Sequence, residues 1–146
     1  MTIPPSPSSF SRPHVLIVSD DLDLVTFLSE GLTLGGFWTS TVASAIQTLE
    51  LFRLRSFDLI LLDDGLAGLG ALELARRLRH DSPSDSSATP RTTVPILLIV
   101  GQTAPPDAVD VAAAGINEMR AAPFELGELL SQMNATLGRP HSPELG

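Results

Sequence analysis

Two short acidic segments follow apolar runs in this sequence and carry the residue types best suited to chemistry. Ser19-Asp20-Asp21 comes directly after the run HVLIV, and Asp63-Asp64 comes directly after the run LILL. Carboxylate oxygens are the ligands that a hard cation such as Mg²⁺ prefers, and such a cation relieves the repulsion between clustered carboxylates. A single aspartate after a strand more often caps the next helix. The two segments are therefore informative only if the fold brings them together.

Apolar patterning predicts five alternations of strand and helix. Continuous apolar runs at residues 14–18, 59–62 and 95–100 are typical of strands buried on both faces, and weaker strands are predicted at 37–41 and 116–120. Apolar residues at helical spacing predict the helices, which lie within residues 24–34, 45–54, 72–80, 105–114 and 124–137. The low-complexity insert 81–93, DSPSDSSATPRTT, has no predicted secondary structure.

Alternating strands and helices of this length predict an α/β fold with a doubly wound, five-stranded parallel sheet and helices on both faces. The flavodoxin-like strand order 2-1-3-4-5 is common in such folds and places its ligand crevice at the carboxyl ends of strands one and three. In that order Asp20 and Asp63 share the crevice. The sequence thus predicts a Mg²⁺ site there, with Asp21 just beyond Asp20.

The ends of the chain differ in composition from its centre. Residues 1–13 and 138–146 are rich in Pro, Ser and Gly and poor in apolar residues, so we expect a flexible N-terminal tail and a flexible C-terminal tail or linker start. One domain is predicted between them, over residues 14–137. No apolar run has the length of a signal peptide core or a membrane span, so we expect a cytoplasmic protein without membrane association.

Charge and missing residue types exclude several classes of function. The 146 residues include 17 acidic and 9 basic side chains, for a net charge of −8, which argues against nucleic-acid binding by this domain alone. There is no cysteine, and every basic residue is arginine. The absence of lysine excludes the phosphate-binding lysine of a GxxxxGK[ST] loop and any Schiff-base mechanism.

Four segments together resemble the receiver domain of bacterial response regulators. They are HVLIVSDD, FDLILLDDGLAGLGALELARRLR, VPILLIVG and AAPF, and the similarity spans residues 15–137. The resemblance implies a signalling module of a two-component phosphorelay rather than an enzyme. It also implies a sensor histidine kinase, or another signalling protein, as partner, and a surface for dimers and partners on the last two helices and the fifth strand.

The resemblance also assigns roles to individual residues. Asp63, at the end of the third strand, is the implied phosphoacceptor, and the backbone carbonyl of Gly65 is an implied Mg²⁺ ligand. The acidic pair that helps receivers hold Mg²⁺ corresponds to Ser19 and Asp20, so one carboxylate of the pair is lost.

Three further positions depart from the receiver pattern. Val100 stands where the family has a Thr or Ser that hydrogen-bonds the phosphoryl group, and Ala122 stands where the family has a lysine. Met119 replaces the aromatic switch residue. Arg120 offers a substitute cation, although a solvated arginine is the simpler interpretation. We therefore expect a degenerate receiver with weak, short-lived or absent phosphorylation of Asp63, which signals through protein contacts.

Two alternatives remain open at this stage. The chain fits a phosphorylatable N-terminal receiver module of a larger DNA-binding transcriptional regulator. Asp63-Asp64-Gly65 also has a superficial likeness to the DxDG motif of aspartate-nucleophile phosphatases, but the second aspartate comes one position early and the usual lysine is missing.

Overall fold

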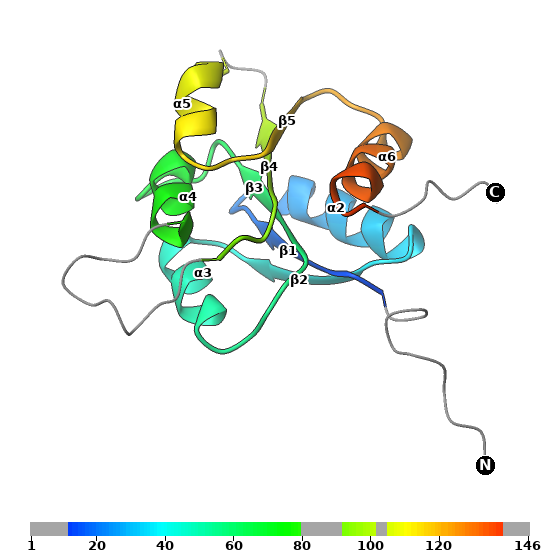
Figure 1. Ribbon diagram of the computed structural model, residues 1–146. Coiled ribbons are helices and arrows are strands. Elements are labelled where there is room, and N and C mark those ends of the chain that lie inside the picture. Colours follow the sequence, from blue (N-terminus) through cyan, green and yellow to red (C-terminus); the bar gives the residue numbers. More distant parts are fainter. Residues whose placement is uncertain (1–11, 80–91, 102–104, 139–146) are drawn as a thin grey trace.

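The computed structural model describes residues 12–79, 92–101 and 105–138. Five strands alternate with five helices in this part of the chain (Figure 1). In chain order they are β1 (His14–Val18), α2 (Leu22–Leu34), β2 (Trp38–Val42), α3 (Ala45–Phe52), β3 (Leu59–Asp63), α4 (Ala71–Arg79), β4 (Ile96–Val100), α5 (Ala108–Ala113), β5 (Glu118–Ala121) and α6 (Leu126–Thr136).

The strands form one parallel sheet in the order β2-β1-β3-β4-β5, which confirms the predicted doubly wound fold. The register pairs Val18 with Leu62, Asp63 with Ile99, and Val100 with Ala121. The carboxyl ends of the four strands β1, β3, β4 and β5 therefore lie level with one another. This alignment brings the predicted site residues to one edge of the sheet.

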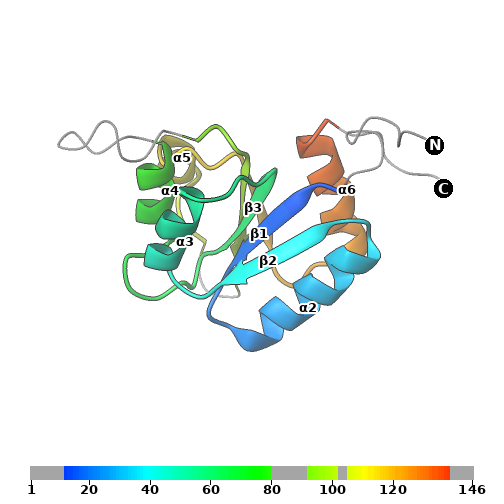
Figure 2. The ribbon, with the colours of Figure 1, turned by 90° about the horizontal axis from the view of Figure 1, so that it is seen from below.

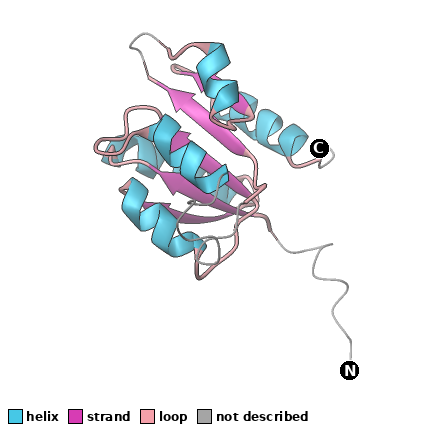
Figure 3. Cartoon of the chain, turned by 60° about the vertical axis from the view of Figure 1, so that its left-hand side comes forward, coloured by secondary structure: helices cyan, strands magenta, loops and turns pink. Residues whose placement is uncertain are grey.

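Apolar side chains on the two faces of the sheet form two cores. One core lies under α3, α4 and α5, whose buried side chains include Ala45, Leu74 and Val111. The other lies under α2 and α6, which bury Leu28 and Met133. Figures 2 and 3 show these helices in two layers on either side of the strands. Burial on both faces explains why the central strands are continuous apolar runs.

Several element boundaries differ from the predicted ones by one to three residues. The second strand begins at Trp38, because the buried Phe37 donates its N–H to the carbonyl of Leu32 and ends the turn after α2. The second helix, α3, ends at Phe52, so Arg53 is its C-cap. The fifth strand lies at Glu118–Ala121, later than predicted. Helix α5 begins after Asp107, whose carboxylate caps it, rather than at the two preceding prolines.

Arg79 joins three segments at the end of α4. Its guanidinium donates to the carbonyl of Gly115 at 2.9 Å, the carbonyl of Thr92 at 2.8 Å and Oδ1 of Asn117 at 2.9 Å. Asn117 Oδ1 also accepts the N–H of Ile96. The predicted insert lies almost wholly in residues 80–91, outside the described residues. Arg79 ties together the residues on either side of that segment.

The described helices include none that is both long and apolar enough to cross a membrane. Most of the two predicted tails lies outside the described residues. At the end of the N-terminal one, the Arg12 guanidinium lies 5.1 Å from the ring centroid of Trp38, and the carbonyl of Pro13 accepts the N–H of Trp38.

We expect Arg79→Lys to lower the free energy of unfolding by about 2 kcal/mol, because an ammonium group cannot reach three separate acceptors in the planar geometry of a guanidinium. Chemical denaturation monitored by circular dichroism measures the change. Arg76→Lys on the same helix is the matched control, because the contact of Arg76 within the described residues is an exposed ion pair with Glu73. Equal stability of the two variants would contradict the role assigned to Arg79.

Candidate functional site

The predicted site centres on a hydrogen bond between β1 and β3. The hydroxyl of Ser19 donates to Oδ2 of Asp63 at 2.7 Å, and the same Ser19 oxygen accepts the N–H of Asp21 at 3.0 Å. Ser19 is only 3% exposed, so its hydroxyl is shielded from water. The residue that replaces one carboxylate of the family's acidic pair thus contacts the predicted phosphoacceptor directly.

The second oxygen of the Asp63 carboxylate is also engaged. Oδ1 accepts the N–H of Gly65 at 2.8 Å, and the backbone carbonyl of Asp63 accepts the N–H of Leu66. These bonds form a tight turn directly after β3. Both side-chain oxygens of Asp63 therefore have a neutral donor, one from β1 and one from the loop between β3 and α4.

Asp20 and Asp21 take different positions. Asp20 Oδ2 accepts the N–H of Ala67 at 3.4 Å, so Asp20 contacts the loop that follows Asp63. Asp21 instead caps α2, because its Oδ1 accepts the N–H groups of Asp23 and Leu24. The structure thus brings Asp20 and Asp63 to the same loop and turns the carboxylate of Asp21 toward the helix.

The carboxylates of this site are few. Within residues 12–79, 92–101 and 105–138, no group of three His, Cys, Asp or Glu side chains is arranged to hold a metal ion. Mg²⁺ needs fewer protein ligands than that, since it is commonly held by one or two carboxylates and retains several waters. Asp20, Asp63 and the carbonyl of Gly65 fit a sparse site of this kind.

The three other departures from the receiver pattern also lie at the carboxyl edge or beside it. Val100 is 2% exposed and belongs to the core under α3, α4 and α5. The N–H of Ala122 donates to the carbonyl of Val100 at 2.8 Å, so these two positions are neighbours at the ends of β4 and β5. Met119 is partly buried and packs against the same core.

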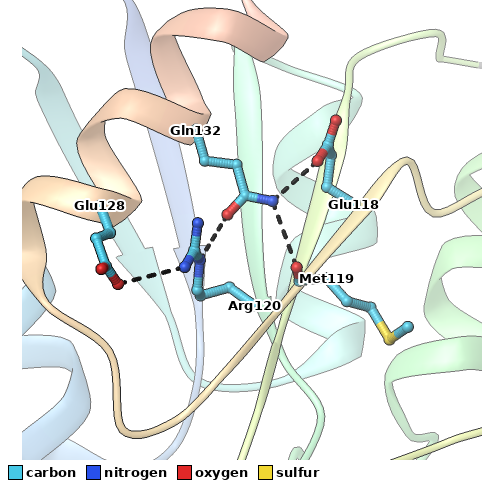
Figure 4. Close-up of polar contacts among 5 residues, drawn as sticks. All are labelled: Glu118, Met119, Arg120, Glu128 and Gln132. Atoms are coloured by element: carbon cyan, nitrogen blue, oxygen red, sulfur yellow. Dashed lines mark hydrogen bonds and ion pairs between the residues drawn. The ribbon is translucent and has the colours of Figure 1, made fainter.

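Arg120 points toward α6. Its Nε donates to Gln132 Oε1 at 2.7 Å, and Nη1 lies 3.5 Å from Glu128 Oε1 (Figure 4). Gln132 Nε2 in turn donates to Glu118 Oε1 and to the carbonyl of Met119. The guanidinium is therefore bound to α6 and does not replace the family's lysine in this arrangement.

Asp64 lies next to the acceptor and is partly buried. Burial raises the pKa of Asp64, and the negative charge of Asp63 raises it further. Its N–H donates to the carbonyl of Ile99, which continues the pairing of β3 with β4 beyond the strand. Asp64 adds negative charge to an edge of the sheet that has no lysine to balance it.

Comparison with known proteins now identifies the family. The family model described as the response regulator receiver domain matches residues 15–134. The chain belongs to this family. Receiver domains are modules of two-component signalling, and this receiver domain keeps the fold and the strand-end aspartates from which the resemblance was inferred.

Relatives of known sequence are longer than this chain. The transcriptional regulatory protein YkoG of Bacillus subtilis is 32% identical over 124 residues, which cover 85% of this chain and 50% of YkoG. The DNA-binding response regulator MtrA of Mycobacterium tuberculosis is 31% identical over 128 residues, which cover 88% of this chain and 52% of MtrA. The chain thus spans about half the length of these curated relatives.

Solved structures share the fold. A response regulator from Chloroflexus aurantiacus superposes with a TM-score of 0.75 at 27% identity, covering 88% of this chain and all of that one. The receiver domain of the sensor histidine kinase PA1611 from Pseudomonas aeruginosa gives a TM-score of 0.74 at 25% identity, covering 88% of this chain and 99% of its own. That structure has a magnesium ion in its active-site cleft.

Two contacts escaped the sequence analysis. A serine in an acidic pair was interpreted only as a lost carboxylate, although a hydroxyl can donate where a carboxylate cannot. The sequence suggests either a substitute cation or a solvated side chain for Arg120, whereas in the structure its guanidinium contacts Gln132 and Glu128 on α6. The polar residues of α6 that can accept from Arg120 are visible in the sequence. Which of them faces β5 depends on how the helix packs against that strand, and only the fold decides this.

We expect Asp64→Asn to stabilise the receiver domain at pH 7, by no more than about 0.5 kcal/mol because solvent screens this partly exposed group. The variant removes a carboxylate whose charged form is less favourable in the folded state than in the unfolded state. Because the folded-state pKa of Asp64 is raised, the penalty is absent below the ordinary pKa of 3.8, grows as the pH rises from there to the folded-state pKa, and is complete above it. Urea unfolding in EDTA at pH 3 and pH 7 measures this. A difference of equal size at both pH values would contradict the electrostatic cause.

Proposed function

We propose that this chain is an atypical receiver domain whose Asp63 is phosphorylated weakly, briefly or not at all, and which signals through protein contacts. The bond between Ser19 Oγ and Asp63 Oδ2 carries the proposal. A buried neutral donor occupies the position of a metal-binding carboxylate and engages one of the two carboxylate oxygens of Asp63. The free energy of that hydrogen bond must be overcome before the oxygen can react.

The same geometry supports weak Mg²⁺ binding. Asp20, Asp63 and the carbonyl of Gly65 would hold the ion. Asp21 would contribute less, because its carboxylate caps α2. When bound, Mg²⁺ supplies positive charge beside a transferred phosphoryl group. With one carboxylate fewer than the family pattern, the attraction for a divalent cation is smaller.

Two losses would also shorten the life of any phosphorylated state. Phosphorylation forms a bond from an Asp63 oxygen to phosphorus and breaks the bond to the donor's leaving group. Val100 has no hydroxyl, and Ala122 has no ammonium group, to stabilise the phosphoryl oxygens on the resulting acyl phosphate. Charge-assisted hydrogen bonds of this kind are worth about 1.5 to 3 kcal/mol each, so their loss weakens coupling between Asp63 and the rest of the fold.

Signalling through protein contacts needs a defined surface. The surface formed by α5, β5 and α6 is the proposed contact surface, for a second copy or another signalling protein such as a sensor histidine kinase. The bonds of Arg120 and Gln132 support it, because they hold α6 against β5. The net charge of −8 supports a protein partner rather than direct nucleic-acid binding by this domain.

Treatment with acetyl phosphate and Mg²⁺ tests the phosphorylation proposal. We expect intact-mass spectrometry to detect little or no adduct on the wild-type chain, similar to Asp63→Asn. The double variant Val100→Thr/Ala122→Lys should accumulate more adduct, because it restores the hydroxyl and the ammonium group. A stable wild-type adduct that is lost in Asp63→Asn and changes the conformation would overturn the proposal.

Restoring the missing carboxylate tests the metal site separately. We expect Ser19→Asp to bind Mg²⁺ about tenfold more tightly than wild type in calorimetric titration. Without the ion, the same variant should unfold more easily, because a buried carboxylate then faces Asp63. Ser19→Asn is the control of matched size without charge. Equal Mg²⁺ affinity of the two variants would contradict the assignment.

A second candidate function has its own support. YkoG and MtrA are named as a transcriptional regulatory protein and a DNA-binding response regulator, and this chain matches about half of each. The chain would then act as the phosphorylatable receiver module of a larger DNA-binding regulator. Efficient phosphorylation of wild-type Asp63 by a histidine kinase favours this candidate. The match to a signalling family gives no support to the phosphatase alternative.

A further inference from the structure

The strand β2, at the outer edge of the sheet, has neither a charged residue nor a proline to protect it against pairing. The strand Trp38–Val42 reads WTSTV and contains no charged residue, whereas β5 at the opposite edge reads EMRA and carries Glu118 and Arg120. Edge strands expose unpaired N–H and carbonyl groups, and proteins commonly protect them with charges, prolines or short lengths. An uncharged edge rich in Thr and aromatic or branched residues is suited to pairing.

The backbone groups that face outward on β2 follow from its pairing with β1. The N–H of Trp38 donates to the carbonyl of Pro13 at 2.9 Å, and the carbonyl of Val42 accepts the N–H of Ser19 at 3.0 Å. Alternate residues of a strand face the same neighbour. Trp38, Ser40 and Val42 therefore face β1, and Thr39 and Thr41 face away from it. In the described part of the chain no strand lies on that side.

The outward N–H groups just beyond the strand are already used. Phe37 donates its N–H to the carbonyl of Leu32 at 2.9 Å, and Ala43 donates its N–H to Gln47 Oε1 at 3.0 Å. Among the described residues, the outward N–H donors left without a partner along this edge are those of Thr39 and Thr41. These two residues lie symmetrically about Ser40, so the edge is complementary to a copy of itself turned by a two-fold rotation.

We propose that two copies of this chain pair antiparallel through β2, with the two-fold axis at Ser40, to form one continuous sheet. In this register Thr39 of each copy lies opposite Thr41 of the other. Each such pair exchanges two backbone hydrogen bonds, as hydrogen-bonded antiparallel pairs do. Ser40 lies opposite its own counterpart in a pair without hydrogen bonds, and Trp38 lies opposite Val42.

The side chains along the edge suit this occupant. Cross-strand pairs of threonine with threonine, and of an aromatic with a β-branched residue, are favourable. Trp38 and Ile46 are each 57% exposed, and pairing would shield apolar surface near them. Each copy carries a net charge of −8, which opposes association in general, but the proposed register places no like charges opposite each other.

The proposed pair leaves the other edge of the sheet free. Figure 2 shows β2 at one side of the sheet, with α2 beside it. The surface of α5, β5 and α6 lies at the opposite edge, because β5 is the last strand in the sheet order. A dimer through β2 would therefore present two copies of that surface to signalling partners without covering either.

Single cysteines test the register directly, because the chain has none of its own. In the proposed pair the two copies of residue 40 have Cα atoms about 4.5 Å apart, within the range for a disulfide. Those of residue 38 are offset along the strands by about 13 Å. We expect Ser40→Cys to form a covalent dimer rapidly under mild oxidation, and Trp38→Cys and Val42→Cys not to, as measured on non-reducing gels.

A proline substitution tests whether backbone pairing drives the contact. Thr41→Pro removes an outward N–H that β1 does not use, so the fold should survive, as checked by circular dichroism. In the Ser40→Cys background it should slow crosslinking about tenfold, whereas Thr41→Val, which keeps the N–H, should leave the rate unchanged. The proposal is overturned by monomeric Ser40→Cys protein after oxidation, by equal crosslinking at residues 38, 40 and 42, or by a rate that Thr41→Pro does not change.

Discussion

Parallel pairing of β1 with β3 is the constraint on which this site depends. It sets Val18 level with Leu62 and so brings Ser19, one residue beyond β1, within hydrogen-bonding distance of Asp63 at the end of β3. The apolar runs of both strands are buried on both faces, which fixes their register against the two cores. The polar residues that follow the two strands therefore meet at one edge of the sheet, whatever the conformation of the more distant loops.

The departures from the receiver pattern are related through charge. Ser19 replaces a carboxylate and removes a negative charge, and Ala122 replaces a lysine and removes a positive one. The carboxylates of Asp20, Asp63 and Asp64 remain at this edge, and the pKa of Asp64 is raised first by burial and then by the negative charge of Asp63. Val100 preserves packing at the end of β4, since a valine has nearly the shape of a threonine but cannot donate a hydrogen bond. The fold thus tolerates the loss of the polar groups because none of them is needed by the core.

The two edges of the sheet have different physical character. At β5, Arg120 and Glu118 are joined through Gln132 to α6, so charged side chains of that strand are held within a network (Figure 4). At β2, the polar side chains are small and uncharged, and Ser40 is bonded to His14 of the neighbouring strand at 2.7 Å. One edge is thereby suited to specific side-chain recognition, and the other to pairing through the backbone.

The sequence by itself determined the alternation of strands and helices, the parallel sheet and the position of Asp20 and Asp63 at strand ends, because apolar runs and strand-end aspartates are local patterns. Its weaker patterns misplaced the starts of β2 and β5 and the end of α3, where single contacts such as Phe37 N–H to Leu32 decide the boundary. Only the tertiary structure decided that Ser19 donates to Asp63, that Asp21 caps α2 and that Arg120 turns to α6. Each of these contacts depends on which acceptor lies nearest in space. Ser19 and Asp63 are 44 positions apart in the chain, and Arg120 and Gln132 are 12 apart, so the sequence does not show that they are close in space.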